Sequence, residues 1–268
     1  MPSPRSTVPR VLTIATSDSG GGAGIQADLK AFAAAGAYGM SVLVALTAQN
    51  TVGVDAIEQL DPGFVRAQLE AVFGDIGVDA AKTGMLFSRR LIEVVADYLV
   101  AHPVPLVVDP VMVASSGAKL LEDDAVGALV GRLFPLAVVV TPNLMEAKAL
   151  AAVDGHRVDA PRRELAERLH ELGARAVIVT GGHGEDAVDH LFDGVEHIEI
   201  PVARHDVAAT HGAGCTHSAT LAALLARGES LEDAARGAAD AAARAVAQGL
   251  AELGSGDGPV DVLGVRNR

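Results

Sequence analysis

A glycine-rich turn in the last quarter of the chain holds its single cysteine. Residues 210–216 read Thr-His-Gly-Ala-Gly-Cys-Thr, and a helical pattern follows over about residues 216–226. A turn at a helix N-terminus presents unpaired N–H groups and the positive end of the helix dipole, which suit an anion. The same setting lowers a thiol pKa, so we expect Cys215 to serve as a base near neutral pH. The alternative is a buried, inert cysteine. The backbone groups that would face the anion are those of Gly212, Ala213, Gly214 and Cys215.

Two acidic side chains follow predicted strands and are candidates for a cation site. Asp109 comes directly after the apolar run 106–108, where a carboxylate suits Mg²⁺ or its water shell, although an aspartate that caps a turn before proline fits equally well. Glu146 lies three residues after Asn143 at a predicted helix start. That spacing predicts either a capping box or a pair that organises Mg²⁺ and phosphate oxygens, and it does not separate the two.

The elements that must position these residues alternate along the chain. Short apolar runs alternate with helical patterns, which predicts an α/β fold: a doubly wound, mainly parallel sheet with helices on both faces, in one domain. Residues 188–192 and 195–200 read as a hairpin with Asp193-Gly194 as its turn. In such sheets ligands bind at the carboxyl ends of the strands. The polar residues predicted at those ends are Asp18, Gln49, Asp109, Asn143 and Thr180.

We place the domain at residues 11–253, after a flexible N-terminal tail (1–10) and before a glycine-rich, mobile C-terminal tail (254–268). The chain is 50% hydrophobic but only 3% aromatic, so aliphatic residues must build the core. A net charge of -13 argues against nucleic acid or an anionic membrane as the partner. One cysteine excludes an internal disulfide, and no apolar run reaches about 18 residues. These features predict a cytoplasmic protein with small-molecule ligands.

Other phosphate and metal motifs are absent from the sequence. No GxxxxGK[ST] motif is present, which excludes a P-loop enzyme, and the glycine run at 20–24 lacks clean GxGxxG spacing. No HExxH pair supports a zinc site. His183 and His211 lie beside glycine turns, and we expect them to have structural or minor roles.

Taken together, the motifs resemble those of the hydroxymethylpyrimidine/phosphomethylpyrimidine kinases, a family of the ribokinase-like superfamily. They appear in the family's order and cover nearly all of residues 11–250. The matching segments are 17–28 (Ser-Asp-Ser-Gly-Gly-Gly-Ala-Gly-Ile-Gln-Ala-Asp), 36–39, 47–51, 82–85 (Lys-Thr-Gly-Met), 109–112, 141–147, 181–183 and 211–216.

The resemblance implies ATP- and Mg²⁺-dependent phosphorylation of 4-amino-5-hydroxymethyl-2-methylpyrimidine and then of its monophosphate, giving the diphosphate for thiamine diphosphate biosynthesis. It also implies a homodimer. The glycine loop ending in Cys215 would form the anion hole over the transferring phosphate. Residues implied to hold the pyrimidine are Asp28, Gln49, Met85 and Val111. Residues implied for ATP and its phosphates are Thr180, Gly182 and Asn143, and those for the metal are Asp109 and Glu146.

One position departs from the family pattern. Thr16 stands where the family usually has glycine, against the substrate, so its side chain would narrow or repolarise the pocket. This keeps a pyridoxal or pyridoxine kinase of vitamin B6 salvage open as an alternative. A non-catalytic pyrimidine-binding module is a further alternative, which the intact Asp109, Glu146 and glycine loop disfavour.

Overall fold

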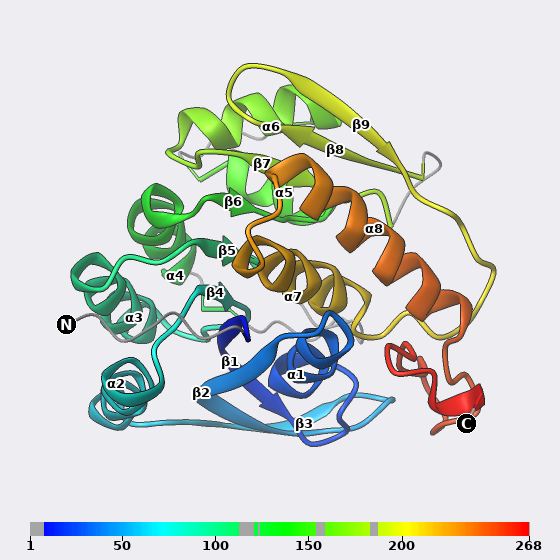
Figure 1. Cartoon of the computed structure of the whole chain (residues 1–268), viewed down its shortest axis with the longest axis horizontal. Helices are drawn as coiled ribbons and strands as arrows, with labels where there is room; N and C mark the ends of the chain where they lie inside the picture. The colour runs from blue at the N-terminus through cyan, green and yellow to red at the C-terminus, as the bar shows by residue number, and fades with distance from the viewer. Residues whose placement is uncertain (1–7, 113–120, 123, 154–158, 183–186, 268) are drawn as a thin grey trace.

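One mixed sheet forms the centre of the molecule. The structure, a computed structural model, describes residues 8–112, 121–122, 124–153, 159–182 and 187–267. Within these residues, nine strands form a single sheet in the order β3-β2-β1-β4-β5-β6-β7-β8-β9 (Figure 1). The strands are β1 (Arg10–Asp18), β2 (Tyr38–Gln49), β3 (Val54–Gln59), β4 (Ala80–Thr83), β5 (Leu106–Val108), β6 (Val139–Val140), β7 (Val177–Val179), β8 (Val188–Phe192) and β9 (His197–Pro201).

The predicted parallel arrangement is confirmed for the middle of the sheet. Strands β2, β1, β4, β5, β6 and β7 pair in parallel, while β3, β8 and β9 pair antiparallel at the two edges. The central strands are continuous apolar runs because both of their faces are covered. Their carboxyl ends therefore meet at one edge, where the polar residues follow.

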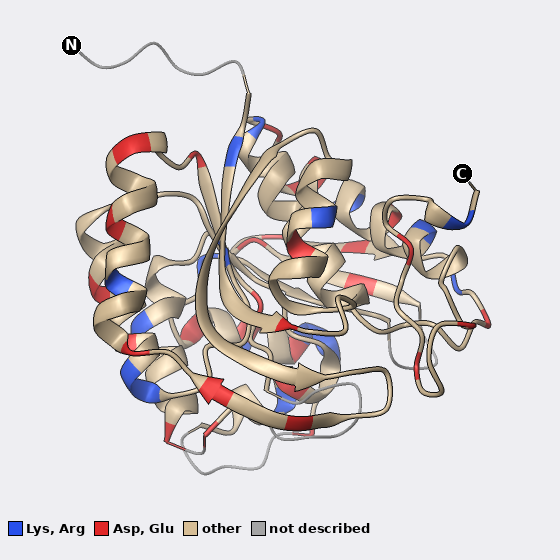
Figure 2. Cartoon of the chain, turned by 90° about the horizontal axis from the view of Figure 1, so that it is seen from below, with Lys and Arg blue, Asp and Glu red and all other residues tan. Residues whose placement is uncertain are grey.

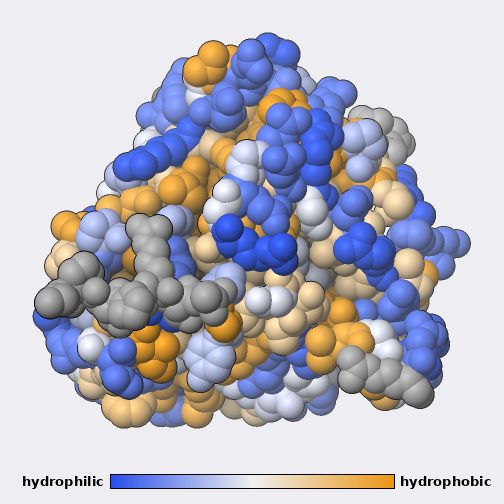
Figure 3. All heavy atoms as spheres, in the orientation of Figure 1, coloured by the Kyte–Doolittle hydropathy of each residue, from blue (hydrophilic) through white to orange (hydrophobic). Residues whose placement is uncertain are grey.

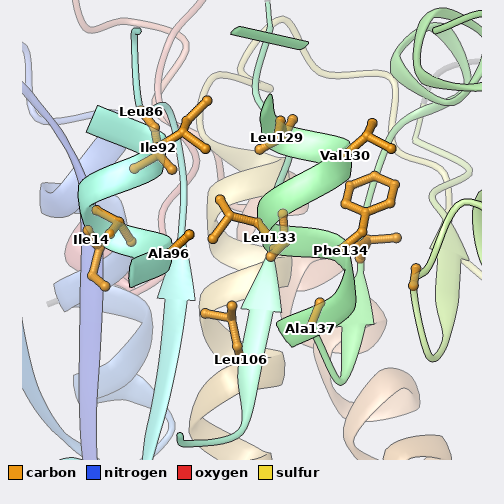
Figure 4. Packing of buried hydrophobic residues seen from close by; sticks show 14 of the residues in the cluster. Ile14, Leu86, Ile92, Ala96, Leu106, Leu129, Val130, Leu133, Phe134 and Ala137 are labelled. Atoms are coloured by element: carbon orange, nitrogen blue, oxygen red, sulfur yellow. The ribbon is translucent and has the colours of Figure 1, made fainter. Parts of the chain in front are cut away.

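Helices cover both faces of the sheet, as predicted. The helices α2 to α6 pack on one face, and α1, α7 and α8 pack on the other (Figure 1). Figure 4 shows Ile92 and Ala96 of α3 in the same apolar cluster as Leu133 and the strand residues Ile14 and Leu106. The helices are α1 (Gly24–Ala34), α2 (Pro62–Ala71), α3 (Arg89–Ala101), α4 (Ala125–Ala128), α5 (Leu144–Ala151), α6 (Arg162–Glu171), α7 (Ala213–Ala226) and α8 (Leu231–Ala247).

Helix α7 is buried along most of its length, between the sheet and α8. Every residue from 216 to 223 is buried, because α7 lies between the sheet and α8. Alanines at the α7–α8 contact let the two helices approach closely, and they include Ala219, Ala223, Ala235 and Ala239. A helix enclosed on all sides holds its N-terminal turn in a fixed place.

Two local features differ from the sequence prediction. Strand β3 was not predicted, since its half-exposed edge position weakens the apolar pattern. The β8–β9 hairpin is present, but its turn is longer than the predicted Asp193-Gly194 pair. It closes with the N–H of Asp193 on the carbonyl of Glu196, and the Asp193 carboxylate accepts the N–H groups of Val195 and Glu196.

The C-terminal segment packs against the domain, in contrast to the mobile tail predicted for residues 254–268. Pro259 forms a parallel bridge with His211, and Val260 and Asp261 are buried. The glycines of this segment serve close packing, because a Cβ on Gly256 or Gly258 would collide with neighbouring carbonyl groups. At the other end of the chain, residues 1–7 of the predicted tail lie outside the described residues, and β1 begins at Arg10.

The molecular surface mixes residue types. In Figure 2 the Lys and Arg positions are separated by stretches of other residues, despite the net charge of -13. On the face shown in Figure 3, hydrophilic residues interleave with small groups of hydrophobic ones. Among the described helices, none has the length and apolar character needed to cross a membrane.

Candidate active site

A cavity of about 390 Å³ opens at the carboxyl ends of the parallel strands. The polar residues predicted at the strand ends all line it, namely Asp18, Gln49, Asp109, Asn143 and Thr180. The loop at 212–215 and Glu146 also line it. Pockets of this size and mixed lining hold small organic ligands. The parallel sheet thus brings together residues as far apart in the chain as Asp18 and Cys215.

The glycine turn at the start of α7 presents two backbone N–H groups. Gly212 has a φ of +86°, and a Cβ there would collide with the carbonyl of Gly22, so glycine is required. Helix α7 begins at Ala213, three residues earlier than predicted, and the N–H of Ala213 donates to Thr210. Among the described residues, the N–H groups of Gly214 and Cys215 have no acceptor. These two amides are the anion donors that the turn offers.

The Cys215 thiol differs from the prediction. Burial raises its pKa to about 12, and the carboxylates of Asp28 and Asp109 add to the rise, while Lys82 and the N–H of Gly24 oppose it. The expected lowering near neutral pH is therefore wrong. Desolvation and two neighbouring negative charges outweigh the helix N-terminus, so the resting thiol keeps its proton.

A buried lysine lies directly beneath this turn. Lys82 Nζ is 2.8 Å from Asp28 Oδ1 and 3.4 Å from Asp109 Oδ2, and the lysine side chain has no exposed surface. Thr13 Oγ1 donates to Asp28 Oδ2 at 2.6 Å, and Ser218 Oγ donates to Asp109 Oδ2 at 2.8 Å. Burial alone would lower the Lys82 pKa, but the carboxylates raise it above its ordinary value. We call these five residues the Lys82 cluster.

This geometry corrects the prediction for Asp28. Its side chain is fully enclosed, and it does not line the cavity. Both of its oxygens are engaged by Lys82 and Thr13, so Asp28 holds the lysine instead of contacting a substrate. The pairing of Lys82 was missed from the sequence. The available signal was a lysine inside the buried strand β4, because a buried charge needs a partner.

One end of the cavity has the apolar and amide groups expected for a pyrimidine. Thr16, Gln49, Met85 and Val111 all line it. The Thr16 hydroxyl donates to the carbonyl of Met85 at 3.1 Å, so it is already used within the protein. Gln49 Oε1 lies 3.2 Å from Thr47 Oγ1, a hydroxyl that also lies 3.0 Å from the carbonyl of Ser17 and shares its one proton between the two acceptors.

Asp18 ties the first glycine loop to the second. Its carboxylate accepts N–H groups from Gly20, Gly22 and Ala23, and His211 Nε2 lies 3.3 Å from it. Burial works to raise the Asp18 pKa, but these hydrogen bonds outweigh it and lower the pKa. His211 Nε2 also lies 3.5 Å from Gln49 Nε2, so His211 connects the Gln49 end of the cavity with the α7 turn. His183 lies outside the described residues.

Asn143 and Glu146 form the predicted capping box and also line the cavity. Asn143 Oδ1 accepts the Glu146 N–H, and Glu146 Oε2 accepts the Asn143 N–H, each at 2.9 Å. Burial raises the pKa of Glu146 to about 8, and the charge of Asp109 adds to the rise. Two carboxylates that repel one another in one cavity would gain from a divalent cation between them.

The donors fit Mg²⁺ in the way that nucleotide sites use it. Carboxylate oxygens are its preferred protein ligands, and one or two carboxylates commonly hold it together with water and phosphate oxygens. Asp109 and Glu146 supply such a pair. Over the part of the chain that the structure describes, no group of three or more His, Cys, Asp or Glu residues suits a metal by itself.

The opposite end of the cavity is built from the turn after β7. Thr180 and Gly182 line it, as predicted. The N–H of Gly181 donates to Asp189 Oδ1 at 2.7 Å, and a Cβ on Gly181 would collide with the backbone of Val188. His217 of α7 lies beside Asp189, and the sequence did not indicate either residue. The small side chains of α8 that complete this end are Ala239, Ala242, Ala243 and Val246.

Comparisons with known proteins agree with this geometry. Residues 18–261 match the family model described as "Phosphomethylpyrimidine kinase". The chain is 49% identical to a hydroxymethylpyrimidine/phosphomethylpyrimidine kinase of Rhizobium meliloti, over 93% of this chain and 95% of the relative.

Two solved structures are also similar. A Bacillus subtilis pyridoxal kinase in complex with ADP has a TM-score of 0.87 at 37% identity, covering 98% of this chain and 100% of the other. A phosphomethylpyrimidine kinase of Clostridium difficile has a TM-score of 0.75 at 40% identity, covering 86% of this chain and 96% of the other.

Proposed function

The chain belongs to the phosphomethylpyrimidine kinase family, and we propose that it phosphorylates 4-amino-5-hydroxymethyl-2-methylpyrimidine and then the monophosphate, using ATP. The observation that carries this proposal is a single cavity that combines three features. It has the Gln49 carboxamide at one end, two backbone N–H groups without acceptors at the start of α7, and the carboxylates of Asp109 and Glu146. Family membership makes the protein a phosphotransferase. The relative of Rhizobium meliloti, named for both substrates, supports the two-step reaction.

In this proposal the Gln49 carboxamide hydrogen-bonds the edge of the pyrimidine ring. A carboxamide both donates and accepts, which matches an aminopyrimidine. Gln49 Oε1 lies beside the Thr47 hydroxyl, and Nε2 lies on the side of His211. Met85 and Val111 supply apolar walls. Thr16 leaves the polarity of this end nearly unchanged, because its hydroxyl bonds to Met85.

The N-terminal turn of α7 stabilises the transferring phosphoryl group. The N–H groups of Gly214 and Cys215 point out of the first helical turn, where they stabilise negative charge. Phosphoryl transfer depends mainly on positioning and electrostatics. A protonated Cys215 thiol fits a positioning role, in which it hydrogen-bonds the hydroxymethyl oxygen in line with the phosphate. The strong thiolate base expected from the sequence is not required.

Mg²⁺ belongs beside Asp109 and Glu146 in this proposal. When bound, it neutralises phosphate charge during transfer. Ser218 and Lys82 hold one oxygen of Asp109, and the capping box holds Glu146, so both carboxylates are fixed before any ligand enters. Thr180, Gly182 and Asn143 lie where the phosphates of ATP would pass.

An ATP-consumption assay with product masses tests the proposal. We expect the pyrimidine to gain one phosphate and then two, each with release of ADP. Pyridoxal serves as the second substrate, since a pyridoxal kinase is among the similar structures. A higher kcat/KM for pyridoxal would replace the proposed substrate, and pyrimidine binding without ATP consumption would indicate a binding module. A cytoplasmic location and a homodimer stay predictions, the second of which light scattering measures directly.

A further inference from the structure

A buried histidine and a buried aspartate lie side by side at the Thr180 end of the cavity. His217 Nε2 is 3.0 Å from Asp189 Oδ2, and the two side chains are only 6% and 4% exposed. Both residues line the cavity. No step of the reaction described above uses either residue.

The pair joins two parts of the site that are far apart in the sequence. Asp189 Oδ1 accepts the N–H of Gly181, while Asp189 Oδ2 faces His217. His217 stands in α7, two residues after Cys215, and therefore in the helix that presents the anion donors. A single carboxylate thus connects the Gly181 turn to the α7 helix.

The His217 ring lacks well-aligned hydrogen bonds. Both ring nitrogens are buried. Nδ1 has no hydrogen-bond partner among the described residues, while Nε2 lies 3.0 Å from Asp189 Oδ2 in a poorly aligned contact. Burial works to raise the Asp189 pKa, but this contact, together with the N–H of Gly181, outweighs it and lowers the pKa. A poorly satisfied buried polar group costs free energy, so a small shift of Asp189 that improves its contact with His217 favours the nucleotide-bound state.

We propose that His217 and Asp189 form a positioning pair that couples nucleotide binding at the Gly181 turn to the α7 anion donors. The proposal rests on the proposed function, because the ligand at this end is the triphosphate of ATP. When a phosphate of the nucleotide binds beside Gly181, Asp189 shifts together with the Gly181 N–H that it accepts, and His217 transmits the shift to α7. The pair acts on the phosphate ligand through backbone groups, and it does not take part in proton transfer.

Paired substitutions separate this role from simple stabilisation. His217→Phe keeps a ring but removes both nitrogens, whereas His217→Gln keeps an N–H donor. We expect His217→Phe to raise the KM for ATP and the Kd for ADP about tenfold, as expected for loss of one buried polar contact. The KM for the pyrimidine should change little, and His217→Gln should recover most of the loss.

Asp189→Ala should weaken nucleotide binding more than His217→Phe does, because it also removes the acceptor of the Gly181 N–H. Asp189→Asn keeps that acceptor and should fall between wild type and Asp189→Ala. If the residues act as one unit, the double variant His217→Phe/Asp189→Ala binds ADP no worse than Asp189→Ala. Additive losses would overturn the coupling.

Asp261→Ala is a matched control. Asp261 is a buried carboxylate that accepts the N–H groups of Val265 and Arg266, and it does not line the cavity. We expect this variant to lower the Tm without moving the KM for ATP. A His217→Phe variant that behaves in the same way would reduce the pair to a structural role. If the wild type phosphorylated neither ring, the proposed function would fail, while ADP affinity would still test the pair.

Discussion

Adjacent residues of α7 contact two buried charge clusters that are built differently. Ser218 donates to Asp109 in the Lys82 cluster, where three hydrogen bonds of 2.6–2.8 Å hold the two carboxylates and the fully enclosed lysine lies 3.4 Å from Asp109. His217 faces Asp189 at 3.0 Å without a well-aligned hydrogen bond. The first cluster is complete without a ligand, and the second is not.

The difference indicates that the Lys82 cluster and the His217–Asp189 pair have separate roles. Buried charges are stable only when paired and hydrogen-bonded, so the Lys82 cluster can serve as a fixed floor beneath Cys215. A pair that is incomplete in the free protein can respond when a ligand arrives. We therefore expect substitutions in the Lys82 cluster to act on stability and turnover, and substitutions in the His217 pair to act on nucleotide affinity.

The largest effect is expected from Lys82→Met, which keeps an unbranched side chain one atom shorter and removes the charge. Asp28 and Asp109 would then remain buried without their cation. Breaking a buried pair in this way should lower the free energy of unfolding by about 3–5 kcal/mol. Urea denaturation measures the loss, and kcat should fall with it because Asp109 loses its position.

The control for Lys82→Met is His217→Phe, which should lower the free energy of unfolding by only about 1–2 kcal/mol. Adding Asp28→Asn to Lys82→Met should restore part of the stability by removing one unpaired carboxylate. An equal loss of unfolding free energy in Lys82→Met and His217→Phe would contradict the distinction between the two clusters.

Cys215→Ala should lower kcat by roughly 10²-fold while the KM for ATP changes little, because misplacing the attacking oxygen can cost that much. Its sulfur lies above the Lys82 cluster, so its loss should resemble a transfer defect and not a nucleotide-binding defect. Steady-state kinetics with each substrate varied in turn separate the two. Cys215→Ser, which keeps a hydrogen-bond donor, should retain more activity. Turnover near that of wild type in the alanine variant would remove Cys215 from the reaction.

The raised Cys215 pKa predicts a specific pH dependence of alkylation. A thiol with a pKa of about 12 is nearly all protonated below that value, so its thiolate fraction grows as pH rises. The iodoacetamide rate of the folded, ligand-free protein should climb about tenfold per pH unit from about pH 7 to pH 10. The same chain in urea should level off near the ordinary value of 9.0, which makes it the control. If the alkylation rate of the folded protein instead reached a plateau near neutral pH, Cys215 would be a thiolate there and could act as the base.

The smallest effect is expected from Thr16→Ala. Loss of the hydrogen bond to the Met85 carbonyl should cost about 1 kcal/mol of stability, measured by thermal or urea unfolding. The ratio of kcat/KM values for the pyrimidine and for pyridoxal should change little, since the hydroxyl does not face the ring. A large shift in that ratio would show that Thr16 selects the substrate.

Local patterns were sufficient to predict most of the elements. The apolar run at 106–108 became β5, and the Asn143–Glu146 spacing became a capping box, because each depends on residues close in sequence. The predicted ends of strands carried the site residues for the same reason. Local signals failed for the glycines of the C-terminal segment, which are needed for close contacts with Thr51 and Leu250.

The sequence by itself determined the parallel sheet, the ligand edge and the glycine turn that opens α7, since periodicity and strand ends encode them. Only the tertiary structure decided the charge pairing. Lys82 pairs with Asp28, which lies 54 positions away in the sequence. Ser218 hydrogen-bonds Asp109 over a sequence separation of 109 residues. That packing buries the Cys215 sulfur beside two carboxylates and reverses the pKa shift expected from its helix terminus. Desolvation depends on everything that surrounds a group, so no local pattern could predict it.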